Sequence, residues 1–284
     1  MSFAIFNEEF YLNSYPDVRN AVNARAISSG FAHFQQFGLA EGRVNVSPYF
    51  DEALYLRKYP DVAAVVGSGS LRSGLQHYIQ YGEAEGRSPG AFNEQGYLTL
   101  YPDVAAAVRA GTFSSGLQHY IRYGQFESNR LSLFSGSTGN DTITGFGGLG
   151  RNTQIVGVDA QEVLLNQQRG DLTVRSANYG KGEVDTLIGG SGRDLFTLGL
   201  PDQSLLPQRF YLGNDSADYA VIKNFEKGKD AIGLVGSSPI SYSLVPTNGN
   251  LNISFGGDLI ATVEGVTSLS RIPGVTPTGT FQLT

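Results

Sequence analysis

The sequence contains no cysteine or tryptophan, one methionine and three histidines. Without cysteine the chain can form no disulfide, thiolate metal site or cysteine nucleophile, so its stability must come from packing or from bound ions. It also lacks a hydrophobic run of the roughly 18 residues that a membrane-spanning helix requires, and we expect a soluble protein without a transmembrane segment. The N-terminal "MSFAIFNEEFYL" has no basic start and is not a typical secretory signal peptide.

Basic residues are also scarce. The chain has 20 Lys and Arg against 26 Asp and Glu, a net charge of −6, whereas a nucleic-acid-binding protein needs a dense basic surface to neutralise phosphates. We therefore expect no nucleic-acid partner. The segment "GFGGLG" at 145–150 matches a dinucleotide fingerprint, but the "RNTQIVGV" that follows is not the helix that this fingerprint requires.

The first 130 residues contain a repeat. The block "FNEEFYLNSYPDVRNAV" at 6–22 returns as "FDEALYLRKYPDVAAVV" at 50–66 and as "FNEQGYLTLYPDVAAAV" at 92–108, and each copy precedes an "SG" block with one histidine. A period of about 40 residues is typical of stacked arrays. We predict three helical repeats, at about 1–46, 47–89 and 90–130.

Local signals predict short helices within each repeat. An Asn or Asp stands where a helix N-cap belongs, a Pro suits the first turn of the next helix, and a Gly stands where a C-cap belongs. These residues are Asn7, Asp51 and Asn93, Pro16, Pro60 and Pro102, and Gly38, Gly82 and Gly124.

The three histidines, His33, His77 and His119, occupy the same place in each repeat. Imidazole is a common metal ligand. However, stacked repeats would hold these side chains apart at the repeat spacing and would not bring them together. We predict that the histidines pack or form hydrogen bonds.

After Arg130 the sequence turns to Gly, Thr, Asp and Asn in short alternating runs, which predict strands. The segment "GGSGRDLFT" at 189–197 fits the nonapeptide G-G-x-G-x-D-x-U-x at every position, with Phe196 as the large apolar residue U. In this motif six residues form a turn and three form a short strand. Successive copies wind a parallel β-roll, and turn oxygens on one side can hold Ca²⁺.

Three other segments fit the motif less completely. Residues 136–144 have serine at the second position, 180–188 have Glu183 where the fourth-position glycine belongs, and 145–153 have Gly150 where aspartate belongs. Consecutive turns of a roll lie on alternate sides, so turns two copies apart share an ion.

The alternation predicts which carboxylates meet. If 154–179 is an excursion from the roll, Asp141 and Asp185 share one side and form the best candidate calcium site. Asp194 lies on the other side without a matching carboxylate, so we predict one or two calcium ions. The predicted metal-binding residues are Gly136, Thr138, Gly139, Asp141, Gly180, Gly182, Asp185, Gly189, Gly190, Gly192 and Asp194.

These nonapeptides, with "DYAVIKNFEKGKDAIGLVG" at 218–236 and "GNLNISFGGDLIATVEGV" at 249–266, resemble the haemolysin-type calcium-binding (RTX) repeat family, in particular its cyanobacterial secreted and surface branch. The YPDV-type units are similar to modules found beside such repeats. The resemblance implies a calcium-binding β-roll and export by type I secretion, which reads an uncleaved C-terminal signal. The final "GTFQLT" is compatible with such a signal, although the chain has few intact copies of the motif.

Residues 200–284 contain further strand candidates, namely "RFYL", "DYAVIKNF", "ISYSLV", "NLNISF" and "DLIATVEGV". We predict a β-rich cap that closes the open end of a roll at 131–199. Asp215, Asp218 and Asp230 are either ligands of another ion or solvated turn residues and strand-end caps, and the second interpretation is favoured.

The sequence thus predicts an α + β multidomain protein with an N-terminal array of short helical repeats and a C-terminal calcium-binding parallel β-roll with a β cap. It contains no G-x-S-x-G or H-E-x-x-H motif, and turns, caps and calcium account for its acidic residues, so we expect no enzymatic activity. We expect an extracellular or cell-surface structural protein that forms a homo-oligomer or polymer, such as a sheath, surface layer or filament. The alternatives are a module that binds polysaccharide or peptidoglycan and, less favoured, a polysaccharide-processing enzyme.

Overall fold

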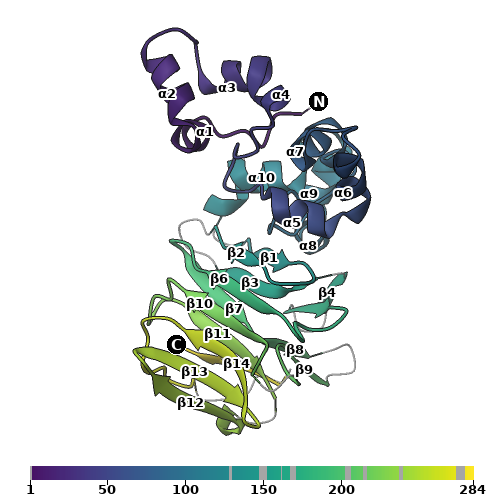
Figure 1. Cartoon of the computed structure of the whole chain (residues 1–284). Helices are drawn as coiled ribbons and strands as arrows, with labels where there is room; N and C mark the ends of the chain where they lie inside the picture. Colours follow the sequence, from purple (N-terminus) through teal and green to yellow (C-terminus); the bar gives the residue numbers. More distant parts are fainter. Residues whose placement is uncertain are drawn as a thin grey trace. The chain divides into compact units, whose positions relative to one another are not determined.

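The computed structural model describes residues 2–127, 130–146, 152–160, 162–166, 171–201, 206–213, 216–236, 239–272 and 279–284. The chain is α + β, with helices in its N-terminal part and mixed, mostly parallel sheets in its C-terminal part (Figure 1). It divides into two compact units. The helical unit comprises Met1–Glu94 and Asp103–His119, and the strand unit comprises Gln95–Pro102 and Tyr120–Thr284.

The three repeats form similar sets of short helices. The first contains α1 (Glu8–Ser14), α2 (Pro16–Asn23), α3 (Gly30–His33), the π-helix η1 (Phe34–Gly38) and α4 (Leu39–Glu41). The second contains α5 (Glu52–Lys58), α6 (Pro60–Gly67), α7 (Gly74–His77) and the π-helix η2 (Tyr78–Gly82). The third contains α8 (Glu94–Leu100), α9 (Pro102–Arg109), α10 (Gly116–Arg122) and the 3₁₀-helix η3 (Gly124–Phe126). The division between the units falls within this third repeat.

The helices begin where the sequence predicts. The side chain of Asn7 accepts a hydrogen bond from the backbone N–H of Phe10 at 2.9 Å, and that of Asp51 accepts one from Leu54 at 2.8 Å. The three prolines are the first residues of α2, α6 and α9. Asn93 is buried directly before α8.

The C-cap prediction is wrong for Gly38 and Gly82. Gly38 keeps right-handed helical angles inside a continuous run of helix, and the left-handed residue that ends this run is Gly42, with φ 74°. A Cβ on Gly38 or Gly82 would overlap the hydroxyl of the tyrosine packed against it, which is Tyr11 or Tyr55. These glycines therefore permit close packing and do not reverse the chain. Gly124 lies two residues after α10 and begins η3.

We expect Gly82→Ala to destabilise the helical unit by about 1–3 kcal/mol, because the new methyl group must displace the Tyr55 hydroxyl. Gly67→Ala in α6 is the matched control, since its Cβ would meet no atom within 4 Å, and it should be neutral or slightly stabilising. Urea denaturation followed by circular dichroism measures both. Equal effects of the two substitutions would contradict the close-packing explanation.

The strands form two large sheets. The first sheet has the order β1-β3-β7-β11-β15 and the second has the order β12-β13-β14-β10-β6-β2. The first contains β1 (Ser132–Gly136), β3 (Asn152–Asp159), β7 (Arg193–Thr197), β11 (Ala231–Val235) and β15 (Thr280–Leu283). The second contains β2 (Thr142–Thr144), β6 (Val184–Ile188), β10 (Tyr219–Lys223), β12 (Tyr242–Thr247), β13 (Asn250–Phe255) and β14 (Asp258–Val263).

The chain alternates between the two sheets. Apart from two hairpins, each strand from β1 to β11 lies in the opposite sheet from the strand before it, and these strands pair with one another in parallel. The apolar U positions consequently line up. Phe196 in β7 lies in register with Ile155 in β3 and Ile232 in β11, and all three side chains are buried.

The excursion expected at 154–179 is shorter in the structure. Residues Asn152–Asp159 form β3, which pairs with β1 on one side and β7 on the other. Its Ile155, Val156 and Val158 side chains are buried, so this apolar run gains more by joining the sheet than by leaving it. Outside the two large sheets lie the hairpins β4 (Glu162–Asn166) with β5 (Asp171–Arg175) and β8 (Gly199–Pro201) with β9 (Pro207–Arg209).

Residues 200–284 contain most of the predicted strands. "DYAVIKNF", "ISYSLV", "NLNISF" and "DLIATVEGV" contain β10, β12, β13 and β14, whereas "RFYL" falls mainly after β9. β10 and β11 continue the two parallel stacks, so the segments expected as roll and cap share the same sheets. The C-terminal "GTFQLT" contains β15, which is antiparallel to β11 and buries Phe281 and Leu283.

Candidate metal centre

Parallel pairing stacks the turns of the strand unit into two columns. The first turn column contains the turns that precede β2, β6 and β10, and the second contains the turns that precede β7 and β11. Neighbouring strands in a sheet lie about 4.8 Å apart, so equivalent turn residues come close together. The turn before β3 would extend the second column, but its residues 147–150 lie outside the described part of the chain.

The first turn column brings Asp141 and Asp185 together, the pair that the sequence singles out. The backbone N–H of Asp141 donates to Oδ1 of Asp185 at 2.8 Å, and the Tyr211 hydroxyl donates to Oδ2 of Asp185 at 2.7 Å. The Asp141 carboxylate accepts hydrogen bonds from the backbone N–H and the hydroxyl of Ser137. Protein donors therefore already occupy both carboxylates.

The predicted glycines serve two purposes. Gly139, Gly180 and Gly182 adopt positive φ values of 97°, 80° and 78°, a backbone conformation that favours glycine. Thr138, which precedes Gly139, is exposed. Gly189 instead permits a close approach, because a Cβ there would lie 3.0 Å from Oδ2 of Asp194. The remaining predicted glycines are Gly136, where a Cβ would overlap the Gly157 carbonyl, and Gly190 and Gly192, which lie in the turn of Asp194.

The second turn column contains an unpaired buried carboxylate. Asp194 is 2% exposed, and neither of its carboxylate oxygens accepts a well-formed hydrogen bond from the described residues; the backbone N–H of Gly190 provides only a weak polar interaction. Its own backbone N–H donates to Oδ1 of Asp230 at 3.0 Å, and Oδ2 of Asp230 accepts from the N–H of Glu226 at 2.8 Å. Among the described carboxylates, that of Asp194 is therefore the one whose charge is least compensated by hydrogen bonds, and it favours binding a cation or a proton.

Burial changes the acidity of these groups. Desolvation raises the pKa of Asp194 to about 7, with a further contribution from the Asp230 charge, while the Gly190 N–H and the Lys229 ammonium lower it. Desolvation also raises the pKa of Asp185 to about 7, opposed by the hydrogen bonds from Tyr211 and from the Asp141 N–H. Buried carboxyls of this kind take up either protons or a metal ion.

One lysine already lies close to the second turn column. Nζ of Lys229 donates to the carbonyl oxygen of Ser191 at 2.6 Å and to Oε1 of Glu226 at 2.8 Å. Ser191 belongs to the turn of Asp194, so this exposed ammonium group supplies positive charge near the unpaired carboxylate. A calcium ion at Asp194 would bind beside it.

The residues present fit calcium through oxygen donors only. Among the described residues, no three His, Asp or Glu side chains gather as a metal-binding group. An ion at Asp194 would therefore need backbone carbonyl oxygens and water as its remaining ligands, which Ca²⁺ accepts readily. When bound, the ion would neutralise the buried charge and link neighbouring turns.

Sequence reasoning underestimated Asp218 and Asp230. Both are fully buried, so they are not solvated, but both lie directly before a strand and accept hydrogen bonds from backbone N–H groups, as the strand-end-cap part of the prediction expects. Asp215 lies outside the described residues. The signal was present, because "FEKGKDAIG" at 225–233 retains the glycine, aspartate and apolar residue at positions four, six and eight of the nonapeptide. Strand register places Asp230 beside Asp194.

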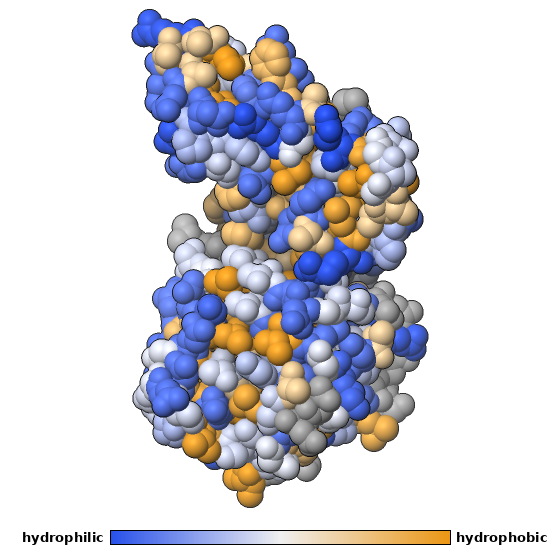
Figure 2. Space-filling model, viewed as in Figure 1, coloured by the Kyte–Doolittle hydropathy of each residue, from blue (hydrophilic) through white to orange (hydrophobic). Residues whose placement is uncertain are grey.

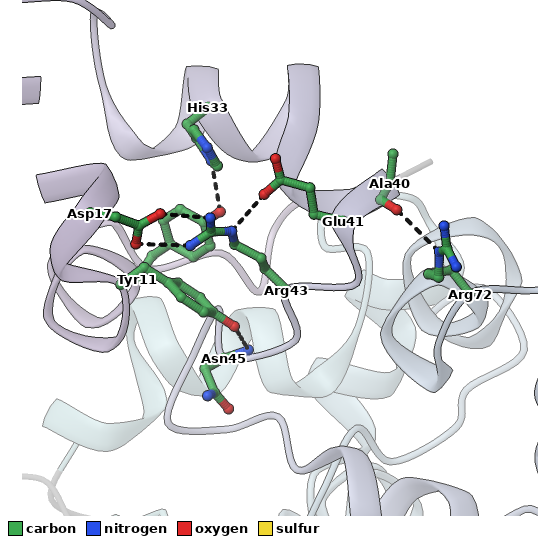
Figure 3. A network of polar contacts seen from close by, with 9 residues as sticks. Tyr11, Asp17, His33, Ala40, Glu41, Arg43, Asn45 and Arg72 are labelled. Atoms are coloured by element: carbon green, nitrogen blue, oxygen red, sulfur yellow. Dashed lines mark hydrogen bonds and ion pairs between the residues drawn. The ribbon is translucent and has the colours of Figure 1, made fainter. Parts of the chain in front are cut away.

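The histidines of the first two repeats form hydrogen bonds, as predicted. Nδ1 of His33 lies 3.0 Å from the Tyr11 hydroxyl, and Nδ1 of His77 lies 3.0 Å from the Tyr55 hydroxyl. Figure 3 shows this contact in the first repeat beside Arg43, which binds both carboxylate oxygens of Asp17 at 3.0 and 2.7 Å. His119 is also buried and packs edge-on against Phe113.

Comparison with known proteins found no matching family model, curated protein or solved structure. No helix among the described residues has the length and hydrophobicity needed to cross a membrane.

Without calcium, the stability of the strand unit is expected to fall as pH rises from about 4 to about 7. The pKa of Asp194 is about 7 in the folded chain and about 3.9 in an unfolded one. The folded state therefore binds more protons in this window, and its advantage is lost above pH 7. Urea denaturation in EGTA at pH 5 and pH 8, followed by hydrogen exchange of the strand unit, measures the effect.

Asp194→Asn tests the source of this dependence, because asparagine does not titrate. The variant should show a smaller loss of stability between pH 5 and pH 8 than the natural chain. An unchanged loss would assign the pH dependence to other groups, such as Asp185.

Proposed function

We propose that the strand unit is a calcium-binding β-roll of the RTX type and that the chain is a calcium-binding structural protein of the cell surface or extracellular matrix. One observation carries the proposal. Asp194, in the complete nonapeptide, is buried, and neither of its carboxylate oxygens accepts a well-formed hydrogen bond from the part of the chain that the structure describes. A carboxylate in this state requires a proton or a cation, and the alternation of parallel strands between two sheets supports a roll.

The structural role includes self-assembly into a homo-oligomer or polymer. Within the described residues β12 pairs only with β13, and it lies at the edge of the second sheet. Its Val245 is 51% exposed. An edge strand with an exposed apolar residue can pair with another copy of the chain, although Pro246 removes one donor from this edge. Export by type I secretion belongs to the same proposal and is supported by the resemblance alone.

Light scattering and electron microscopy of the purified chain in calcium chloride and in EGTA test the proposal. We expect large ordered particles in calcium and smaller species in EGTA. Val245→Lys should reduce assembly without changing calcium binding, because it places a charge on the β12 edge. A monomer under both conditions would contradict the self-assembly part.

Exposed aromatic residues favour a second candidate function, the binding of extracellular polysaccharide. Phe37 and Tyr81 occupy the same place in two repeats, are 43% and 53% exposed, and each lies 5.7 Å from the ring of a buried histidine. Tyr123 is their equivalent in the third repeat and is 52% exposed. Figure 2 shows apolar residues scattered among hydrophilic ones on the viewed surface. Aromatic faces at repeated positions are suited to stacking on sugar rings.

A glycan array separates the two candidates. If the helical unit binds polysaccharide, the natural chain should bind particular glycans, and the combined substitutions Phe37→Ala and Tyr81→Ala should abolish the signal. Val65→Ala, at another exposed apolar residue of this unit, is the control. Particles that form in calcium without any glycan binding would favour the structural role alone.

A further inference from the structure

We infer that Glu183 and Asp218 form a divalent-cation site of their own, at the fourth turn positions of the first turn column. This site uses residues other than the aspartates of the nonapeptide sixth positions. It does not depend on calcium binding at Asp194.

Strand register places the two residues side by side. Val184 pairs with Tyr219 in the parallel ladder of β6 and β10, and Glu183 and Asp218 directly precede this pair. The backbone N–H of Tyr219 donates to the carbonyl oxygen of Glu183 at 3.1 Å. In the layer above, the equivalent residue is Gly139, whose N–H donates to Oε1 of Glu183 at 2.8 Å. The nonapeptide has glycine at this position, and here two successive layers have an acid instead.

Each of the two carboxylates is only half satisfied. Oε1 of Glu183 accepts from Gly139 and also from Nδ2 of Asn178 at 2.8 Å, and Oδ2 of Asp218 accepts from the N–H of Gly182 at 2.9 Å. The other oxygen of each group, Oε2 of Glu183 and Oδ1 of Asp218, has no hydrogen-bond partner among the residues that the structure describes. Glu183 is 4% exposed and Asp218 is 0% exposed. Two adjacent buried acids with one unpaired oxygen each must be neutralised, and one cation bound between them neutralises both.

The dimensions and chemistry suit calcium. Adjacent layers lie about 4.8 Å apart, and two Ca²⁺–oxygen bonds of 2.3–2.6 Å can span that distance. Calcium takes about six to eight oxygen ligands, so water and backbone carbonyl oxygens would complete the shell. Lys181 and Gly182 in the adjoining turn are exposed, so the turn that carries Glu183 lies at the protein surface.

Calcium titration of the full-length chain by isothermal calorimetry tests the assignment. Glu183→Gln and Asp218→Asn each remove one charge and keep an oxygen for the existing hydrogen bonds. Each should lower the calcium stoichiometry by one ion. Glu264→Gln is the control, because Glu264 is exposed and pairs with Lys223 at 3.3 Å, and it should leave the stoichiometry unchanged.

Asp194→Asn separates this site from the one under the proposed function. Loss of one ion in Asp194→Asn but not in Glu183→Gln or Asp218→Asn would overturn the present inference and leave the proposed site intact. The reverse pattern would support the present inference and remove Asp194 as a ligand. If no variant changes the stoichiometry, or the natural chain binds no calcium, both assignments fail.

Crystals of the natural chain grown in calcium chloride give a measurement that does not depend on the folding of any variant. A calcium peak that contacts Oε2 of Glu183 and Oδ1 of Asp218 is the expected result. Water alone at these two oxygens would overturn the inference.

Discussion

Removal of calcium with EGTA is expected to expose the backbone amides of the strand unit while the helical unit stays protected. The strand unit holds the buried acids Glu183, Asp185, Asp194, Asp218 and Asp230, which repel one another when ionised without a counter-ion. A bound ion whose free concentration is 100 times its dissociation constant stabilises the folded state by about 2.7 kcal/mol. Hydrogen exchange measured by mass spectrometry in calcium chloride and in EGTA resolves the two units.

The helical unit provides an internal control for this experiment. Its exposed ion pairs, such as Arg87 with Asp61 at 2.7 Å, join oppositely charged protein groups, so EGTA should not affect them. Magnesium chloride in place of calcium chloride controls for ionic strength. Equal exchange of β6 and β7 in calcium and in EGTA would contradict calcium-dependent ordering.

Phe196→Ala is expected to destabilise the strand unit by about 3–5 kcal/mol, whether or not calcium is present. Phe196 is completely buried in β7, and its ring centroid lies 5.9 Å from that of Phe225. Truncating a buried phenylalanine costs its transfer free energy and leaves a cavity. Urea denaturation in calcium chloride and in EGTA should show a similar loss in both conditions.

Val221→Ala provides the comparison for Phe196→Ala, because Val221 lies in β10 on the less buried side of the strand. Val221→Ala should lower the free energy of unfolding by less than about 1.5 kcal/mol, since less apolar area is removed from the core. If Phe196→Ala had an effect only in calcium, its side chain would be acting through the ion site and not through the core.

The helical repeats could be predicted because each of their signals is local. Asn7 and Asp51 cap the helices that they immediately precede. The functions of Gly38 and Gly82 could not be predicted, because they depend on tyrosines that lie 27 residues earlier and pack against them in three dimensions. A helix-ending glycine and a glycine in a tight contact are indistinguishable in a local pattern.

The strand unit was predictable where the nonapeptide keeps its aspartate and apolar residue. The complete copy at 189–197 forms the turn and strand expected of it, and Asp141 and Asp185 of two incomplete copies meet as the spacing predicts. The turn that contains Asp230 was not recognised in the sequence, because it lacks the glycines that begin the nonapeptide. Asn224, at the start of this turn, adopts the left-handed φ of 55° instead. The proximity of Glu183 and Asp218 could not be predicted either, because it depends on strand register and the two residues lie 35 positions apart in sequence.

The arginine that ends each of the first two repeats has a consequence for how the chain can vary. Arg43 and Arg87 bind an aspartate of their own repeat and lie over a tyrosine ring of that repeat, at 4.8 and 4.7 Å. A duplicated repeat therefore brings its own counter-charge and aromatic support for this arginine. The repeats are nevertheless not independent, because the buried Glu83 of the second repeat accepts hydrogen bonds from Ser114 and Ser115 of the third. A change in the number of repeats must therefore preserve such bonds between neighbours, just as loss of a layer in the strand unit would remove a carboxylate that its neighbour's amide requires.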